Sequence, residues 1–384
     1  MKNIQLLNKI AKVGTDCLPA DVYNVGTEVS APEGIMVRSA KMHDMAFNPE
    51  LLAIARAGAG VNNIPVDRCA EEGIVVFNTP GANANGVKEL AICALLLASR
   101  KVVDGINWAK SLAGSEDVAK QVEAGKSKFG GCEIAGKTLG VIGLGAIGGM
   151  VANAALALGM NVIGCDPFLS VAGAWQLDRR VACAATFDEV YAKADYITLH
   201  VPATADTKGM INDKTIATMK DGVKIVNLAR AELVCSEAIA AALESGKVGA
   251  DVTDFPTEET VAMAGAVTIP HLGASTEESE DNCAVMAAKE LDEYLALGNI
   301  RNSVNYPALV SAPAGAARVC ILHAADAEVL GAATALVSGV AAATTKTRGN
   351  NAYTVIDLAA APGADLADKL TAIAGVRRAR VIVF

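Results

Sequence analysis

Apolar residues follow two alternating patterns along the first hundred positions. Short apolar runs end in loops rich in glycine, proline or asparagine, and this pattern predicts three strands, in EGIMVRSA, LLAIARAGAG and GIVVFNTPG. The next segment, NGVKELAICALLLASRK, places its apolar residues three and four positions apart, which is typical of one helix face. Residues 1–99 are therefore predicted to form an α/β stretch.

The same alternation returns between about residues 101 and 270. Strands are predicted in TLGVIG, NVIGCD, YITLHV, VKIVNLA, GADVTD and AVTIP. Because these strands are almost wholly apolar and helices separate them, they indicate a parallel sheet covered on both faces. A long amphipathic helix is predicted next, beginning after Ser275 or Thr276 and ending near Gly298 and Asn299.

A small α+β module is predicted over residues 317–384, after a linker at 307–316. Its expected order is strand, helix, strand, helix, strand, in RVCILHA, AEVLGAATALVSG, NAYTVIDLA, LADKLTAIAG and RRARVIVF. The length of 384 residues allows about two to three domains.

Composition narrows the classes of protein. The formal net charge of −9 argues against nucleic acid as a partner. No apolar run approaches the ~20 residues of a membrane span, and the first residues lack a signal-peptide core. Nine cysteines without a C-x-x-C pair predict reduced thiols in a cytoplasmic protein and no metal site.

The segment TLGVIGLGAIGGMVA predicts a dinucleotide site, because it places G-x-G-x-x-G between a strand and a helix. Gly143 permits the tight turn, Gly145 lets the backbone approach a pyrophosphate, and Gly148 lets the helix pack on the strand. Asp166 follows Gly148 by 18 positions, at the end of the next strand. A carboxylate there can bind the ribose hydroxyls and repel a 2′-phosphate, so NAD is favoured over NADP.

Three further residues suggest an enzyme. Arg230, Glu258 and His271 each follow a predicted strand of the parallel sheet, and ligands bind beyond the carboxyl ends of such strands. Together they offer a cation for a carboxylate, a titrating base and an acid that orients the base. These are the groups that hydride transfer from a 2-hydroxy acid requires.

At this point the chain resembles the D-isomer-specific 2-hydroxyacid dehydrogenases, most closely the members that act on 3-phosphoglycerate. The shared segments are VRSA, ARAGAGVNNI, VVFNTPGANANGVKELA, GKTLGVIGLGAIG, CDPF, LHVPAT, VNLAR and PHLGASTEES. The resemblance implies a Rossmann-type NAD domain at 100–287, inserted into a flavodoxin-like substrate domain formed by 1–99 and 288–306. It also implies that the C-terminal module, residues 317–384, is similar to a small regulatory ACT domain.

The implied activity is NAD-dependent oxidation of 3-phosphoglycerate to 3-phosphohydroxypyruvate, the entry step of serine biosynthesis, in a homo-oligomer. Two alternatives remain at this point. One is reduction of another 2-keto acid, such as hydroxypyruvate or glyoxylate. The other is a non-catalytic dinucleotide-sensing protein, which the complete set of Arg230, Glu258 and His271 disfavours.

The resemblance also implies residue roles. His271 is the general acid/base, Glu258 orients it, and Arg230 holds the C1 carboxylate. The implied cofactor contacts are Gly143, Gly145, Ala146, Ile147, Gly148, Asp166, Pro167, His200, Val201, Pro202, Thr207, Leu228, Ala229, Arg230, Asp254, His271 and Gly273. The implied substrate contacts are Arg38, Ser39, Arg56, Ala59, Gly60, Arg230 and His271.

Several positions depart from the family pattern. Ala146 stands where an arginine or histidine is usual, and Ala231 where a glycine is usual. Thr253 aligns with the acid that contacts the nicotinamide carboxamide, so either Thr253 or the following Asp254 makes that contact. Glu258 and His271 are only 13 positions apart, and Glu259 competes for the acid role.

The C-terminal module departs further. His323 keeps its expected place on the first strand, but Ala325 and Gly339 stand where effector-binding members carry polar side chains. The module is therefore expected to keep the ACT fold rather than to bind an effector, or to serve in subunit pairing.

Overall fold

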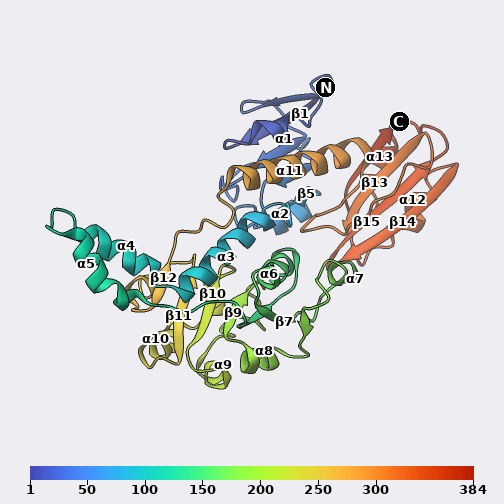
Figure 1. The fold of residues 1–384 in the computed structure, drawn as a ribbon. Helices are drawn as coiled ribbons and strands as arrows, with labels where there is room; N and C mark the ends of the chain where they lie inside the picture. Colours follow the sequence, from blue (N-terminus) through green and yellow to red (C-terminus); the bar gives the residue numbers. More distant parts are fainter. The chain divides into compact units, whose positions relative to one another are not determined.

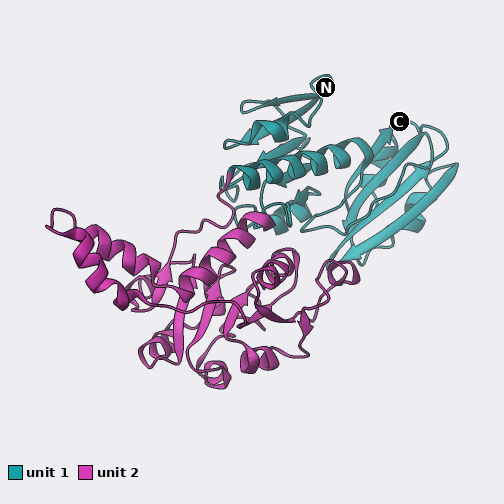
Figure 2. Ribbon diagram, viewed as in Figure 1, with its two compact units in different colours: residues 1–83, 277–384 teal, residues 84–276 magenta.

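The computed structural model describes all residues 1–384, which form two compact units (Figure 2). Unit 1 contains Met1–Asn83 and Glu277–Phe384, and unit 2 contains Ala84–Thr276. Because unit 1 is built from two separate stretches, the glycine-rich loop of unit 2 lies in the middle of the sequence. The functional boundaries at 99/100 and 287/288 stay a prediction.

Unit 2 is built on a seven-stranded sheet in the order β12-β11-β10-β9-β6-β7-β8, with every pair parallel. The strands are β6 (Thr138–Ile142), β7 (Asn161–Cys165), β8 (Ala182–Cys183), β9 (Tyr196–Leu199), β10 (Val223–Asn227), β11 (Val248–Thr253) and β12 (Ala266–Thr268). The sequence reverses direction across the sheet between β6 and β9, which is the position where doubly wound sheets bind ligands.

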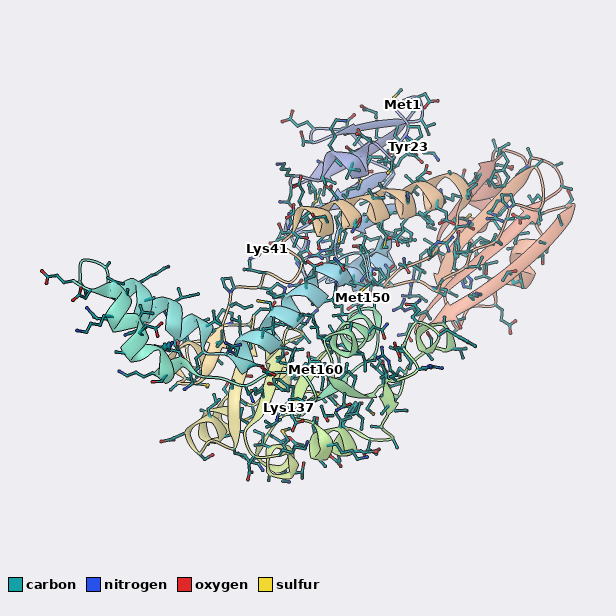
Figure 3. All side chains as sticks on the ribbon, in the orientation of Figure 1. Met1, Tyr23, Lys41, Lys137, Met150 and Met160 are labelled. Atoms are coloured by element: carbon teal, nitrogen blue, oxygen red, sulfur yellow. The ribbon has the colours of Figure 1, made fainter.

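Helices cover both faces of this sheet, as the apolar strands predict. On one face α3 (Ala84–Ser99) packs against α6 (Ala146–Ala157), β10 and β11, and the other carries α8 (Phe187–Lys193), α9 (Asp213–Thr218) and α10 (Ser236–Glu244). Lys137 and Met160 precede β6 and β7 and mark the edge opposite the glycine loop (Figure 3). The remaining short elements are α7 (Val171–Ala174), η2 (Ala231–Leu233) and η3 (Thr260–Ala262).

An arm of helices extends from the sheet of unit 2 (Figure 1, teal). It comprises α4 (Val102–Ser111), α5 (Val118–Gly125) and the 3₁₀ turn η1 (Lys126–Phe129). No residue of α4 is buried, and the arm's internal aromatic contact joins Trp108 to Phe129, with ring centroids 5.1 Å apart.

The sheet of unit 1 is also fully parallel, in the order β2-β1-β3-β4-β5. This is the flavodoxin-like order that the family resemblance implies. Its strands are β1 (Lys2–Leu7), β2 (Tyr23–Gly26), β3 (Gly34–Val37), β4 (Ala53–Arg56) and β5 (Val75–Phe77). The helices α1 (Lys12–Thr15), α2 (Val66–Glu71) and α11 (Glu277–Leu297) pack around it, α11 against α1, β3, β4 and β5.

The C-terminal module is a four-stranded antiparallel sheet in the order β14-β15-β13-β16. Its elements are β13 (Ala317–Ala324), α12 (Val329–Thr334), β14 (Val340–Arg348), β15 (Asn351–Leu358), α13 (Leu366–Thr371) and β16 (Val376–Val383). The strand β14 was not predicted, and the helices α12 and α13 are shorter than the two predicted helices. The segment VAAATTKTR is an edge strand whose residues are all exposed, so it lacks the apolar signal on which strand prediction depends.

Both apolar faces of this antiparallel sheet are covered within unit 1. The helices α12 and α13 cover one face, and the other face shares a core with α11, where Cys320, Tyr353 and Val355 pack with Tyr294 and Leu295. The module is therefore part of unit 1, and the edge strand β14 is the exposed part of its sheet.

Arginines of the module donate hydrogen bonds to helix carbonyl groups elsewhere in unit 1. Arg380 donates to the carbonyls of Tyr294 and Leu295 near the end of α11, and its guanidinium lies 4.2 Å from the Tyr294 ring centroid. Arg377 and Arg378 donate to the carbonyls of Ala70 and Glu72 at the end of α2. Cations at the carbonyl end of a helix oppose its dipole and bind acceptors that the helix leaves unpaired.

The fully buried Arg318 completes this attachment. Its guanidinium pairs with Asp357 at 2.7 Å and 3.0 Å and donates to the Leu297 carbonyl and to Asn299. Ser311, in the segment predicted as a linker, accepts two further bonds from it.

Nowhere does the structure contain a helix both long and apolar enough to cross a bilayer.

Candidate active site

The three glycines of the loop after β6 serve three different purposes. Gly143 has a φ of 88°, and a Cβ there would lie 2.6 Å from the His200 carbonyl oxygen. A Cβ on Gly148 would lie 1.9 Å from the Gly143 carbonyl oxygen, so helix and turn could not pack. A Cβ on Gly145 would meet no atom within 4 Å, which leaves open space at the start of α6.

That open space fits a pyrophosphate. Gly145 precedes α6, whose first N–H groups receive no side-chain cap, and a helix N-terminus of this kind binds anions. Ala146 and Ile147 open the helix, so their predicted contacts are through the backbone.

Asp166 follows β7 and is tied to the same loop. Its carboxylate accepts hydrogen bonds from the Leu144 N–H and from the Phe168 N–H, both at 2.9 Å. These two bonds fix a carboxylate beside the glycine turn, where the sequence analysis expects the adenine ribose. Pro167 lies between the two bonded positions.

The loop after β9 borders the glycine turn. The Val201 side chain lies 2.8 Å from the position of a Cβ on Gly143. The Thr207 hydroxyl donates to the Pro202 carbonyl at 2.6 Å and closes this loop. The Nε2 atom of His200 is 2.9 Å from the Thr198 hydroxyl, and burial lowers the pKa of His200 to about 4. His200 is therefore neutral at physiological pH.

The turn after β10 presents Arg230. Its shape is held by Asn227, which is 2% exposed: the amide oxygen accepts from the N–H groups of Ala229 and Arg230, and the amide nitrogen donates to the Arg230 carbonyl. Leu228 is buried at the base of this turn. Asn227 is part of the segment VNLAR, but no role was predicted for it from the sequence.

His271 lies beside a buried carboxylate at the end of β11. Its Nδ1 atom is 3.8 Å from Oδ2 of Asp254, which is 1% exposed, whereas His271 itself is 58% exposed. The Phe255 ring meets the imidazole edge-on, with centroids 4.8 Å apart. A Cβ on Gly273 would lie 3.6 Å from Asp254 Oδ2, so Gly273 borders the same group.

Glu258 is not brought to His271. It is exposed, and the carboxylate within ion-pair distance of the imidazole belongs to Asp254. Its neighbour Glu259 accepts a hydrogen bond from the Thr257 hydroxyl at 2.7 Å, which lowers the pKa of Glu259. The orienting role implied for Glu258 stays a prediction.

Unit 1 gathers a second group of predicted residues at the carboxyl edge of its own sheet. Arg38 follows β3 and pairs with Glu280 at 2.6 Å, while Arg56 ends β4 and donates to the Arg38 carbonyl. Burial lowers the pKa of Arg56, and the nearby Arg38 guanidinium adds to that effect. Two neighbouring cations of this kind favour an anionic ligand.

Asparagines that the sequence analysis missed shape this edge. Asn8, after β1, accepts from the N–H groups of Ser39 and Ala40 and has a left-handed φ of 70°. Asn78, after β5, donates to the Ala59 carbonyl at 2.6 Å, next to Gly60. Strand-end asparagines would have signalled these two positions.

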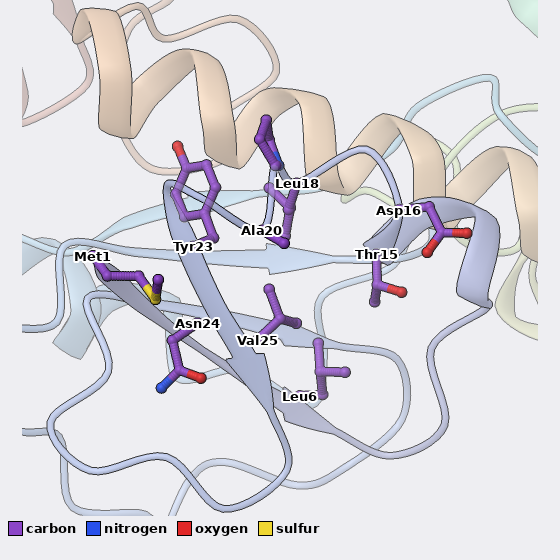
Figure 4. Close-up of a pocket in the computed structure, with 10 residues that line it drawn as sticks. Met1, Leu6, Thr15, Asp16, Leu18, Ala20, Tyr23, Asn24 and Val25 are labelled. Carbon is purple, nitrogen blue, oxygen red and sulfur yellow. The ribbon is translucent and has the colours of Figure 1, made fainter.

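Another hollow of unit 1 does not suit an anion. A cavity of about 680 Å³ lies beside β1, α1 and β2 (Figure 4). Asp16 is the only charged side chain in its lining, and it pairs with Lys12 at 2.5 Å. The lining of the cavity therefore offers no arginine or lysine side chain to a carboxylate or a phosphate.

Comparisons with known proteins agree with this geometry. The family model "D-isomer specific 2-hydroxyacid dehydrogenase, NAD binding domain" matches residues 94–273. The chain is similar to proteins named D-3-phosphoglycerate dehydrogenase. The protein of Synechocystis sp. is 35% identical, and the match covers 80% of this chain and 54% of the relative. The protein of Mycobacterium leprae is 38% identical, and the match covers 72% of this chain and 52% of the relative. The chain spans about half the length of the curated relatives it matches.

Solved structures show the same fold. An NAD⁺-bound 3-phosphoglycerate dehydrogenase of Entamoeba histolytica is 25% identical, covers 79% of this chain and 98% of its own, and gives a TM-score of 0.62. A glyoxylate reductase of Paecilomyes thermophila is 26% identical, with coverage of 79% and 98% and a TM-score of 0.65. The predicted fold class and the predicted cofactor NAD are confirmed, and the chain belongs to the D-isomer-specific 2-hydroxyacid dehydrogenases.

Proposed function

We propose that the chain catalyses NAD-dependent oxidation of 3-phosphoglycerate to 3-phosphohydroxypyruvate. The observation that carries this proposal is the convergence at one sheet edge of unit 2: an open glycine turn tied to Asp166, the Arg230 turn and the His271 imidazole. The relatives named D-3-phosphoglycerate dehydrogenase support the choice of substrate.

Each residue then has a defined task. NAD, which the glycine turn and Asp166 would hold, would supply the hydride acceptor for oxidation at C2 of the substrate. His271 takes the C2 hydroxyl proton, and its exposed imidazole is open to a ligand. Arg230 holds the C1 carboxylate, for which a planar guanidinium is suited. The backbone at the start of α6 holds the pyrophosphate, and Asp166 holds the ribose hydroxyls.

The paired arginines of unit 1 support a substrate with a second anionic group. Arg38 and Arg56 are joined through the Arg38 carbonyl, and one of them is partly neutralised by Glu280. A phosphate suits two guanidinium groups, each of which offers several fixed donors. We propose that this edge, with Ser39, Ala59 and Gly60, binds the anionic substrate.

A panel of 2-keto acids with NADH, followed by absorbance, tests the proposal. We expect phosphohydroxypyruvate to give the highest kcat/KM. The second candidate is reduction of glyoxylate or hydroxypyruvate, which the similarity to a glyoxylate reductase favours. Turnover of glyoxylate without turnover of phosphohydroxypyruvate would show that the substrate assignment is wrong.

We further propose a homo-oligomer in the cytoplasm, paired through the arm of unit 2, residues 102–129. Its α4 has no buried residue, yet it carries Val102, Val103 and Ile106, which are 47%, 37% and 48% exposed. A ten-residue helix that buries none of its residues is marginal in water, so a second copy of the chain is the partner that would cover it. All nine cysteines are free, which supports a reducing compartment.

A further inference from the structure

We propose that Asp254, rather than Glu258, is the carboxylate that positions the His271 imidazole. The inference rests on the proposed function, in which His271 is the base, and it gives that base its own partner in this chain.

The geometry provides the first argument. Asp254 is 1% exposed at the end of β11, and its Oδ2 atom lies 3.8 Å from His271 Nδ1, within ion-pair distance. The ring of Phe255, the residue after Asp254, meets the imidazole edge-on, with ring centroids 4.8 Å apart. The imidazole thus presents Nδ1 to the carboxylate and leaves Nε2 for the substrate hydroxyl.

The electrostatics of Asp254 provide the second argument. Its Oδ1 atom is buried without a hydrogen-bond partner. Burial raises the pKa of Asp254, while His271, backbone N–H groups at Asp254 and Gly273, and Arg230 act in the opposite direction. A buried carboxylate is costly unless it is paired, so Asp254 favours the ring orientation in which His271 Nδ1 faces its Oδ2 atom.

The loop that carries Glu258 supplies the third argument. Thr257 and Thr260 close a tight turn, in which each side-chain hydroxyl accepts from the other residue's N–H, at 3.2 Å and 2.8 Å. This turn leads into η3 and leaves Glu258 exposed. In this chain the carboxylate beside the histidine therefore comes from the strand end instead of the following loop.

Kinetics of matched variants test the proposal. Relative to the parent, Asp254→Asn should lower kcat about 10²-fold or more while KM for NAD and the Kd for NADH change less than threefold. The loss should exceed that of Glu258→Gln at least tenfold. A greater loss in Glu258→Gln would overturn the proposal. So would a weakened NADH affinity in Asp254→Asn with kcat retained, because Asp254 would then be a carboxamide contact.

Imidazole ¹⁵N NMR gives a readout that needs no substrate, so it separates this proposal from the substrate assignment. The chain has four histidines, and the His271→Asn spectrum identifies the His271 signal. We expect the Nδ1–H tautomer in the parent and in Glu258→Gln, and its loss in Asp254→Asn. An Nε2–H tautomer in the parent would refute the positioning role even if Asp254→Asn failed to fold.

Discussion

Two carboxylates of unit 2, those of Asp166 and Asp251, have different surroundings. Asp166 accepts two backbone hydrogen bonds and stays accessible beside the glycine turn. Asp251, within β11, is 3% exposed, and its Oδ1 atom has no partner. Burial without a partner disfavours the carboxylate anion of Asp251 and raises its pKa.

Replacing Asp166 with alanine should raise KM for NAD and lessen discrimination against NADP. The carboxylate that binds ribose hydroxyls also repels a 2′-phosphate, and the variant loses both effects. Paired NAD and NADP titrations measure the change. Asp221→Ala, next to the opposite edge of the sheet, is the control, and an unchanged cofactor preference in Asp166→Ala would contradict the contact.

The pH dependence of stability should report on Asp251. Burial raises the pKa of Asp251 from 3.8 to about 7, so between these values the folded state binds a proton that the unfolded state has released. Folding stability due to this group therefore falls as pH rises through that window and levels off above about pH 7. An asparagine side chain cannot titrate, so Asp251→Asn should gain up to about 4 kcal/mol on the parent between about pH 4 and pH 8.

Denaturant unfolding of the parent and Asp251→Asn across this range measures the effect. The exposed Asp21→Asn is the matched control and should show a difference that does not vary with pH. A constant difference between the parent and Asp251→Asn would mean that Asp251 is ionised in the folded protein.

Residue identities were easier to predict than residue partners. The sequence showed Gly143, Asp166, Arg230 and His271 because each stands at a fixed offset from an apolar strand. It left Thr253 and Asp254 as alternatives and gave Glu258 the orienting role. The partner of His271 depends on how the turn at Thr257 and Thr260 directs the loop, and short-range hydroxyl bonds of this kind leave no periodic signal.

At the scale of elements, strands with continuous apolar runs were predictable and exposed elements were not. The strands β6, β7, β9 and β10 are buried on both faces and were predicted within one or two residues. The edge strand β14 and the arm helices were missed, because neither buries a face that would impose a period on the sequence.

The attachment of the C-terminal module should depend on Arg318. Arg318→Met would remove the guanidinium but leave Asp357 buried, and an uncompensated buried charge costs about 3–5 kcal/mol. Unfolding by denaturant measures the loss. Lys346→Met on the exposed β14 should change stability by no more than about 0.5 kcal/mol. A loss below about 1 kcal/mol for Arg318→Met would show that the module is not held by this residue.

At the scale of the whole molecule, the proposed homo-oligomer needs a contact surface that is exposed on the single chain. The antiparallel sheet of the C-terminal module packs β13, β15 and β16 within unit 1. Its exposed edge strand β14 carries mainly alanine, threonine and charged residues, so it offers little apolar surface for subunit pairing. The arm of unit 2 is the better candidate, because α4 buries none of its residues and the aromatic contact of Trp108 is made within the arm.

Ile106→Asp should therefore convert the assembly to single chains of 39.2 kDa. Ile106 is 48% exposed on α4. Full burial of an exposed isoleucine contributes about 1.5–3 kcal/mol, so covering this side chain contributes about half of that. In a two-fold symmetric dimer each substitution acts twice, and each new carboxylate would have to be buried without a partner. Light scattering after gel filtration measures the mass. Leu158→Asp, at a site outside the arm that is 45% exposed, should leave the oligomer intact. A parent protein that is already monomeric, or an Ile106→Asp variant of unchanged mass, would exclude the arm as the subunit contact.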